Sequence, residues 1–220
     1  MTRLRAFCLS GILCLASSSL FAGGLLNLKD IVRGEFSQKR MTAVRPMADG
    51  VTYSQISADG KQIVCYSFRT GMQESVLFDA ATARGGQVNR VDDYIVSPDG
   101  RRILIQTQTK PIYRRSFTAV YYIYDIRNNK LTPLSDGGPQ QTPVFSPDGN
   151  QIAFVRDNNI WLVKLLYDNA ESQVTKDGKF NEVLNGIPDW VYEEEFSTNS
   201  SMVFSADSKQ MSGYAMMRRT

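Results

Sequence analysis

The apolar positions of this chain fall in short runs, several of them strictly alternating with polar residues, and polar turns separate the runs. Four of the turns share one phrase, in which a Ser stands two residues before an Asp. The phrases are residues 57–60, 97–100, 146–149 and 205–208. A Pro fixes φ, an Asp side chain binds nearby backbone, and a Gly takes a positive φ. Each phrase therefore predicts a hairpin turn between a short apolar strand and an alternating one.

The spacing of the four phrases predicts the architecture. Their first residues are separated by 40, 49 and 59 positions. Third strands rich in β-branched and aromatic residues follow at 75–79, 119–125 and 159–163. Three or four strands per repeat of this length are typical of β-propeller blades, so we expect an all-β chain forming a partial β-propeller. A β-sandwich is the alternative, but its hairpins would not keep one turn phrase at such intervals.

The fourth repeat departs from the other three. Its second strand reads Met-Ser-Gly-Tyr at 211–214, and Gly213 weakens a strand interior. We expect no third strand after it, so that the array ends in mid-blade.

Composition narrows the classes of function. The chain has 220 residues, and 42% of them are hydrophobic, which is typical of a globular protein. Its 25 Lys and Arg nearly balance its 22 Asp and Glu, and this small net charge argues against a nucleic-acid binder. It contains no His, so it cannot by itself build a Ser-His-Asp or Cys-His relay or a His-ligated metal site. Walker, Rossmann and G-x-S-x-G phrases are also absent from the sequence. We expect no catalytic residue, no cofactor and no metal.

The first residues have the order of a secretory signal. Arg3 and Arg5 precede an uncharged, mainly apolar run over 6–22 that is short for a bilayer-spanning helix. We expect a signal peptide over 1–22, export to the periplasm or the exterior, no other membrane association, and a lead-in segment over 23–45. Cys65 then remains in an alternating run, where a lone Cys is expected to be a small buried apolar residue.

Two charged segments carry the candidate chemistry. The first, 185–196, contains Glu193, Glu194 and Glu195 after a Pro-Asp pair that can cap a short helix. Three adjacent carboxylates repel one another unless a cation such as an ammonium ion lies between them. The alternative is a solvated acidic turn with Trp190 and Phe196 packed beneath it. The second is the predicted loop 109–116, which carries Lys110, Arg114 and Arg115, and the guanidinium of Arg114 could hold a carbonyl or carboxylate.

The sequence Asp-Trp-Val-Tyr-Glu-Glu-Glu at 189–195, with Asn-Gly-Ile at 185–187, closely resembles the double-glutamate motif of the dipeptidyl peptidase IV family, serine peptidases of the prolyl oligopeptidase clan. The likeness extends over the mature chain and includes 113–119 and 122–125. The resemblance implies an eight-bladed propeller that caps an α/β-hydrolase domain. In the family, that hydrolase domain removes X-Pro or X-Ala dipeptides from peptide N-termini. About four of those blades would lie in 46–220, with a short helical insertion carrying the Glu motif.

The same resemblance assigns roles to the charged residues. Glu194 and Glu195 would bind the free α-amino group of a peptide substrate, with Glu193 as adjacent support. Arg114 stands where the family has an arginine that contacts a substrate carbonyl oxygen. A buried ammonium group needs carboxylates that compensate its charge. Holding the N-terminus of the peptide also fixes the position of the second peptide bond, so that a dipeptide is removed. Family members are often homodimeric.

The family places its nucleophilic Ser, Asp and His in a C-terminal α/β-hydrolase domain, which this sequence lacks. We therefore expect an N-terminal propeller portion of a secreted dipeptidyl peptidase, inactive alone and able to engage peptides productively only together with a catalytic domain. The competing hypothesis is an exported propeller module that binds another protein through its loops without catalysis.

Overall fold

The computed structural model describes residues 26–38 and 43–217, and the chain divides into two compact units between Met41 and Thr42. The described part of the first unit holds the helix α1 (Leu28–Val32), which begins after Asn27, whose side-chain oxygen accepts a hydrogen bond from the Lys29 N–H. The predicted signal peptide lies outside the described residues. Within them, no helix is long and apolar enough to cross a bilayer.

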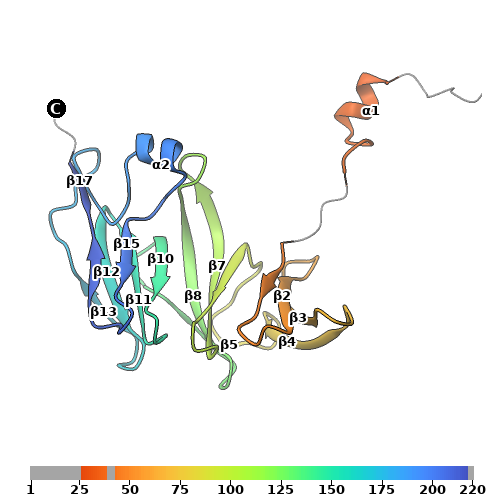
Figure 1. Ribbon diagram of the computed structural model, residues 1–220, viewed down its shortest axis with the longest axis horizontal. Coiled ribbons are helices and arrows are strands. Elements are labelled where there is room, and N and C mark those ends of the chain that lie inside the picture. Colours follow the sequence, from red (N-terminus) through yellow and green to blue (C-terminus); the bar gives the residue numbers. More distant parts are fainter. Residues whose placement is uncertain (1–25, 39–42, 218–220) are drawn as a thin grey trace, which may run out of the picture. The chain divides into compact units, whose positions relative to one another are not determined.

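The second unit is built from antiparallel sheets that follow one another along the chain (Figure 1). The first sheet contains β1 (Arg45–Pro46), β2 (Thr52–Ile56), β3 (Gln62–Ser67) and β4 (Gln73–Asp79). The second contains β6 (Asp93–Val96), β7 (Arg102–Pro111), β8 (Phe117–Asp125) and β9 (Lys130–Pro133), and β5 (Arg84–Gly85) pairs parallel to β9. The third contains β10 (Gln141–Phe145), β11 (Gln151–Arg156), β12 (Asn159–Lys164) and β13 (Ala170–Gln173). These sheets are successive blades of a partial β-propeller, as the repeat predicted.

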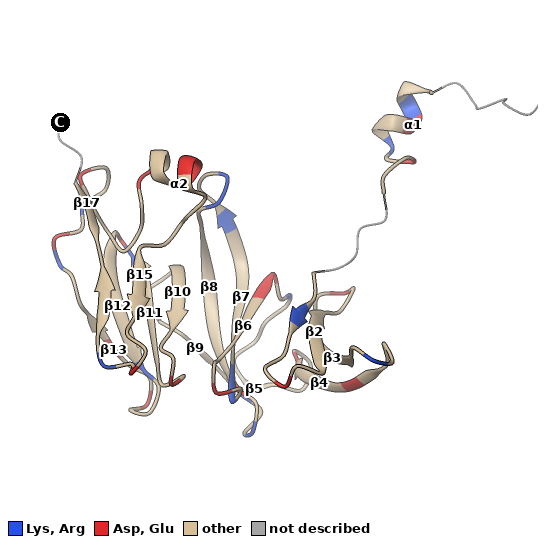
Figure 2. Cartoon of the chain, in the orientation of Figure 1, with Lys and Arg blue, Asp and Glu red and all other residues tan. Residues whose placement is uncertain are grey.

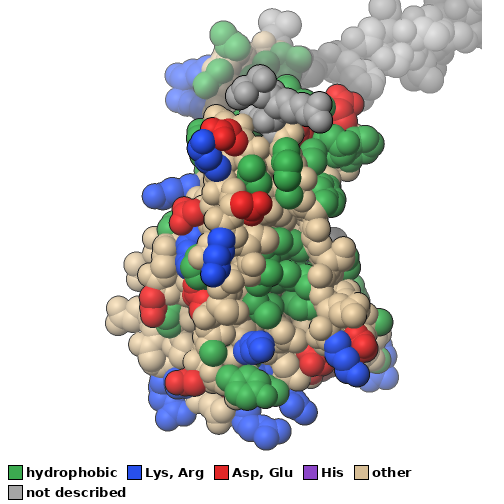
Figure 3. Space-filling model, turned by 90° about the vertical axis from the view of Figure 1, so that its left-hand side faces the viewer, with side chains coloured by type: hydrophobic (Ala, Val, Ile, Leu, Met, Phe, Trp, Pro, Cys, Tyr) green, Lys and Arg blue, Asp and Glu red, His purple; other side chains and the backbone are tan. Residues whose placement is uncertain are grey.

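The fourth repeat forms two short strand pairs. In it β15 (Met202–Phe204) pairs with β16 (Met211–Gly213), and β14 (Val183–Asn185) pairs with β17 (Ala215–Met217). The expectation that no further strand follows Gly213 is wrong, because Val183–Asn185 supplies backbone partners for Ala215–Met217. The fourth-repeat side of this unit shows a band of apolar side chains between charged ones (Figure 3).

Successive residues of the inner strands β7 and β11 face different neighbouring sheets. In β7, Ile103 and Ile105 pack with residues of the first sheet, whereas Leu104 packs against the third. In β11, Phe154 faces the second sheet and Ala153 faces the fourth repeat. Successive side chains of a strand point to opposite faces, so a strand covered on both sides needs an unbroken apolar run. Cys65 in β3 is buried as predicted.

The turn phrases form the hairpins predicted for them, and all four make the same hydrogen bonds. In each, the Ser Oγ donates to the Asp Oδ1 at 2.6 Å, and that oxygen accepts the N–H two residues further on. The fourth position always has a positive φ, including Ser208 at 61°, where the other turns have Gly. The Oγ of Ser208 accepts the N–H of Asp148 at 3.0 Å, so this turn also binds the turn of the third sheet.

These hydrogen bonds lower the pKa of three turn carboxyls below the ordinary value of 3.8. The main cause is the Ser57 hydroxyl for Asp59, the Ser146 hydroxyl for Asp148 and the Ser205 hydroxyl for Asp207. A group whose pKa is lower in the folded state stabilises the fold above its unfolded pKa, and this stabilisation disappears as the pH falls through the folded pKa.

We therefore expect the triple variant Asp59→Asn, Asp148→Asn, Asp207→Asn to be less stable than the wild type near neutral pH. The difference should shrink steadily as the pH falls below about 4, because the wild-type carboxyls then become protonated and neutral like the amides. Urea unfolding of both proteins between about pH 7 and pH 2 measures this difference. A gap that stayed constant across this range would contradict the assignment.

Candidate functional site

The acidic segment forms the helix α2 (Trp190–Phe196), as its Pro-Asp start predicted. The side chain of Asp189 caps it by accepting the Tyr192 N–H at 3.0 Å. The helix ends at Ser197, which adopts the left-handed conformation. The chain enters α2 from β14 and leaves it toward β15, so the helix is an insertion of the fourth repeat.

The basic segment forms the tip of the hairpin between β7 and β8. The predicted loop 109–116 is shorter than expected, because β7 continues to Pro111 after an irregularity at Gln108, which has a φ of 54°. A bulge of this kind accommodates the extra residues and lets pairing resume, so Lys110 lies on a strand. The remaining tip, 112–116, presents Arg114 with 74% of its side chain exposed.

The helix and the hairpin tip lie against each other (Figure 2). One carboxylate oxygen of Glu193 accepts the backbone N–H groups of Arg115 and Ser116, both at 2.8 Å. The side-chain amide of Asn199, just after the helix, donates to the carbonyl oxygen of Arg115 at 3.0 Å. Segments almost 80 positions apart in sequence are thus held together by bonds to one short stretch of backbone.

The three glutamates point in different directions, because neighbouring residues of a helix are rotated by about 100°. Glu193 is buried, with 3% of its surface exposed. Glu194 lies 3.4 Å from the guanidinium of Arg114 and is partly exposed. Glu195 is exposed. The structure therefore brings Arg114 next to Glu194 and Glu193 next to the Arg114 loop, and it leaves Glu195 open to solvent.

The alternative reading of this segment required aromatic residues packed beneath a solvated acidic turn, and this is wrong. Trp190 and Phe196 are 50% and 68% exposed, and the buried member of the helix is Glu193. An acidic residue is buried in place of the aromatic ones because its carboxylate has two backbone partners, which offset the cost of removing it from water.

A cavity of about 460 Å³ lies beside α2 and the hairpin tip. Glu193, Tyr113 and Trp190 line it together with Arg156 at the end of β11 and with the turn 157–158 that follows. Arg156 is itself buried, pairs with Glu171 at 2.7 Å and lies 3.9 Å from the ring centre of Trp161. Among residues 26–38 and 43–217, no group of three or more His, Cys, Asp and Glu side chains is arranged to hold a metal ion.

Sequence reasoning missed Asn199 and the attachment that Glu193 makes. Asn199 stands in the polar run 197–201, whose composition is that of any turn, and its partner is a backbone carbonyl far away in sequence. Glu193 could be identified as a member of the motif from the sequence. Its burial could not, because it depends on the tip of the hairpin between β7 and β8, which belongs to another blade.

Comparison with known proteins identifies relatives of this chain. Residues 97–218 match the family model described as the dipeptidyl peptidase IV N-terminal region. Prolyl endopeptidase FAP of Homo sapiens is 34% identical over 196 residues, covering 89% of this chain and 25% of the relative. A probable dipeptidyl-aminopeptidase B of Colletotrichum graminicola is 41% identical over 129 residues, covering 57% of this chain and 14% of the relative.

A solved structure resembles the fold closely. The crystal structure of Porphyromonas gingivalis dipeptidyl peptidase 4 matches with a TM-score of 0.79 and 42% sequence identity, over 83% of this chain and 26% of that one. This chain thus spans about a quarter of the length of the human relative and of the bacterial structure.

Proposed function

Because the chain belongs to the dipeptidyl peptidase IV family, whose N-terminal region it contains, we propose that it holds the N-terminus of a peptide substrate for a secreted serine-type dipeptidyl peptidase. The names of its relatives, a prolyl endopeptidase and a dipeptidyl-aminopeptidase, support a peptide as the substrate. In this proposal the substrate loses an X-Pro or X-Ala dipeptide. The apolar run over 6–22, which follows Arg3 and Arg5 as in a secretory signal, supports export.

The contact between Arg114 and Glu194 carries the proposal. It joins a carboxylate, which suits an α-ammonium group, to a guanidinium, which suits a peptide carbonyl oxygen. The Arg114 side chain is mostly exposed, and exposed ion pairs contribute only about 0–1 kcal/mol. A peptide can therefore insert its ammonium group beside Glu194 at little cost, with Glu195 on the next position of the helix as the second carboxylate.

Bond cleavage is assigned to a separate domain. A serine peptidase needs a general base beside its nucleophile, and the family's base is a His, which this chain lacks. The role proposed for Glu194, Glu195 and Arg114 is to fix the chain end so that the second peptide bond reaches the catalytic serine. Positioning of this kind lowers the barrier without taking part in the chemistry. The 220-residue chain alone should bind but not cleave.

We expect the full chain to bind Gly-Pro-amide with a Kd on the order of 1 mM and its N-acetylated form far more weakly, because acetylation removes the ammonium charge. NMR titration of backbone amides measures both. The double variant Glu194→Gln, Glu195→Gln should lose the preference for the free amine. Glu182→Gln is the matched control, since it removes a carboxylate that pairs with Lys179 outside the site. Equal binding of the free and acetylated peptides to the wild type would contradict the proposal.

A further inference from the structure

Glu193 differs from the other two glutamates because its carboxylate is already engaged. It is buried, and its Oε1 accepts two successive N–H groups, those of Arg115 and Ser116, at 2.8 Å each. Two consecutive N–H groups that converge on one point form a small anion-binding concavity in the backbone. Here the anion comes from the chain itself.

We infer that Glu193 is a positioning residue, which fixes the hairpin tip so that Arg114 stands beside Glu194, and that it does not bind the substrate amine. We call its two bonds to the Arg115 and Ser116 N–H groups the Glu193 tether. The purpose of the tether rests on the proposed function, but its existence does not. The motif therefore divides its carboxylates between two tasks, with Glu193 facing the protein and its neighbours facing the substrate.

The hairpin tip needs such a support. Within 112–116, the backbone is closed by bonds from the Ile112 and Tyr113 N–H groups to the Ser116 carbonyl oxygen, and Arg114 itself is mostly exposed. A five-residue tip held only at its base would leave the guanidinium free to sample many positions. The tether and the bond from Asn199 hold the N–H and the carbonyl oxygen of Arg115, the residue next to Arg114.

The chemistry of the tether makes the charge and length of Glu193 important. Hydrogen bonds to an ionised acceptor are roughly twice as strong as neutral ones, so a Gln at this position would keep one acceptor but weaken both bonds. An Asp is shorter by one methylene group and would not reach both N–H groups without moving the helix.

Amide hydrogen exchange of the full chain, followed by NMR, tests the tether directly. In Glu193→Gln we expect the Arg115 and Ser116 amides to exchange about 10-fold faster than in the wild type, and in Glu193→Ala about 100-fold faster. Glu194→Gln and Glu182→Gln should leave both amides unchanged. Asn199→Ala supplies a milder second variant, because it releases only the Arg115 carbonyl. Wild-type exchange rates in folded Glu193→Gln would overturn the tether.

Peptide titration separates positioning from direct amine binding. If Glu193 acts through Arg114, Glu193→Gln and Arg114→Ala should weaken binding of Gly-Pro-amide by similar factors, and the double variant should be no weaker than Arg114→Ala alone. Factors that multiply would instead identify Glu193 as an independent amine ligand and overturn the positioning role. If the wild type binds no peptide, the proposed function fails, while the exchange rates still decide whether the tether exists.

Discussion

Under the proposed function, replacing Glu194 and Glu195 by Gln in a peptidase that joins this chain to a dipeptidyl peptidase catalytic domain should lower kcat/KM on an X-Pro substrate by at least about 100-fold. The α-ammonium group would lose two charge-assisted hydrogen bonds, each worth about 1.5–3 kcal/mol. Part of this energy orients the second peptide bond, so kcat falls as well as KM rising. Steady-state kinetics on a Gly-Pro chromogenic substrate measure both constants.

The matched control for this experiment is Glu182→Gln, whose carboxylate pairs with Lys179 and lies outside the site. It should leave kcat and KM at their wild-type values. Single substitutions add information, because Glu194 is the residue in contact with Arg114 and Glu195 is the exposed one. If the double variant hydrolysed the substrate with unchanged kcat/KM, the amine-binding role of these residues would be wrong.

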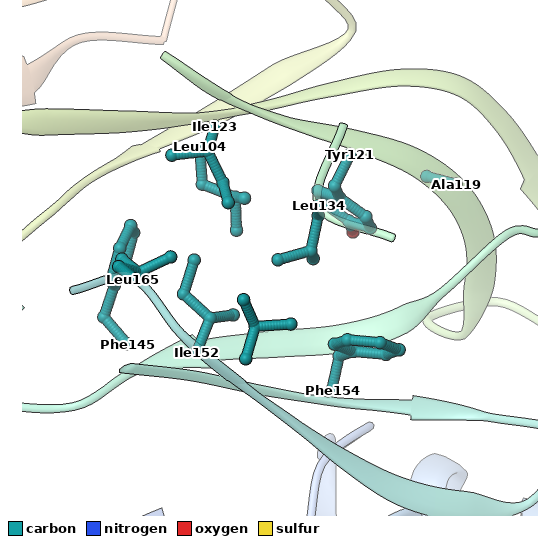
Figure 4. Packing of buried hydrophobic residues seen from close by; sticks show 10 residues of the cluster. Leu104, Ala119, Tyr121, Ile123, Leu134, Phe145, Ile152, Phe154 and Leu165 are labelled. Atoms are coloured by element: carbon teal, nitrogen blue, oxygen red, sulfur yellow. The ribbon is translucent and has the colours of Figure 1, made fainter. Parts of the chain in front are cut away.

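The variant Phe154→Ala should destabilise the fold by about 3–5 kcal/mol, the range found when a buried aromatic side chain is truncated. Phe154 is fully buried in β11 and belongs to the cluster that joins the second and third sheets (Figure 4). The cluster includes Leu104 and Tyr121 of the second sheet, so the cavity would open at the boundary between two blades.

Urea unfolding of the full chain measures this loss as a decrease in the midpoint concentration. Phe180→Ala is the control, since Phe180 is 76% exposed and its removal should change the free energy of unfolding by less than about 0.5 kcal/mol. Equal destabilisation by the two substitutions would contradict the placement of Phe154 in a core between sheets.

The blades could be predicted from the sequence because their determinants are local. A turn phrase such as 146–149 fixes its own hydrogen bonds. The strand after it was expected to alternate, and this is wrong, because residues 152–155 are all apolar and neighbouring sheets bury both of its faces. The end of β7 could not be predicted, because the irregularity at Gln108 depends on pairing with β8. The β14–β17 pair was missed for a similar reason, since its partners are separated by α2 and a hairpin.

The candidate site was predictable in its members and less so in its geometry. The capping of α2 by Asp189 follows from adjacent residues, and the structure has it as expected. The resemblance set Glu193 apart as a support for the other two glutamates, but its bonds to the Arg115 and Ser116 N–H groups could not be foreseen, because these groups lie almost 80 positions away in the sequence.

The tether also has a mechanical consequence. It joins the fourth repeat directly to the second sheet, although the third sheet lies between them in the order of blades. Stacked repeats ordinarily contact only their immediate neighbours. Separation of the third sheet from the sheets on either side of it should therefore require the two hydrogen bonds of the Glu193 tether to break. The three blades should vibrate as one block, and the earliest rupture under heat or force should occur at a seam outside it.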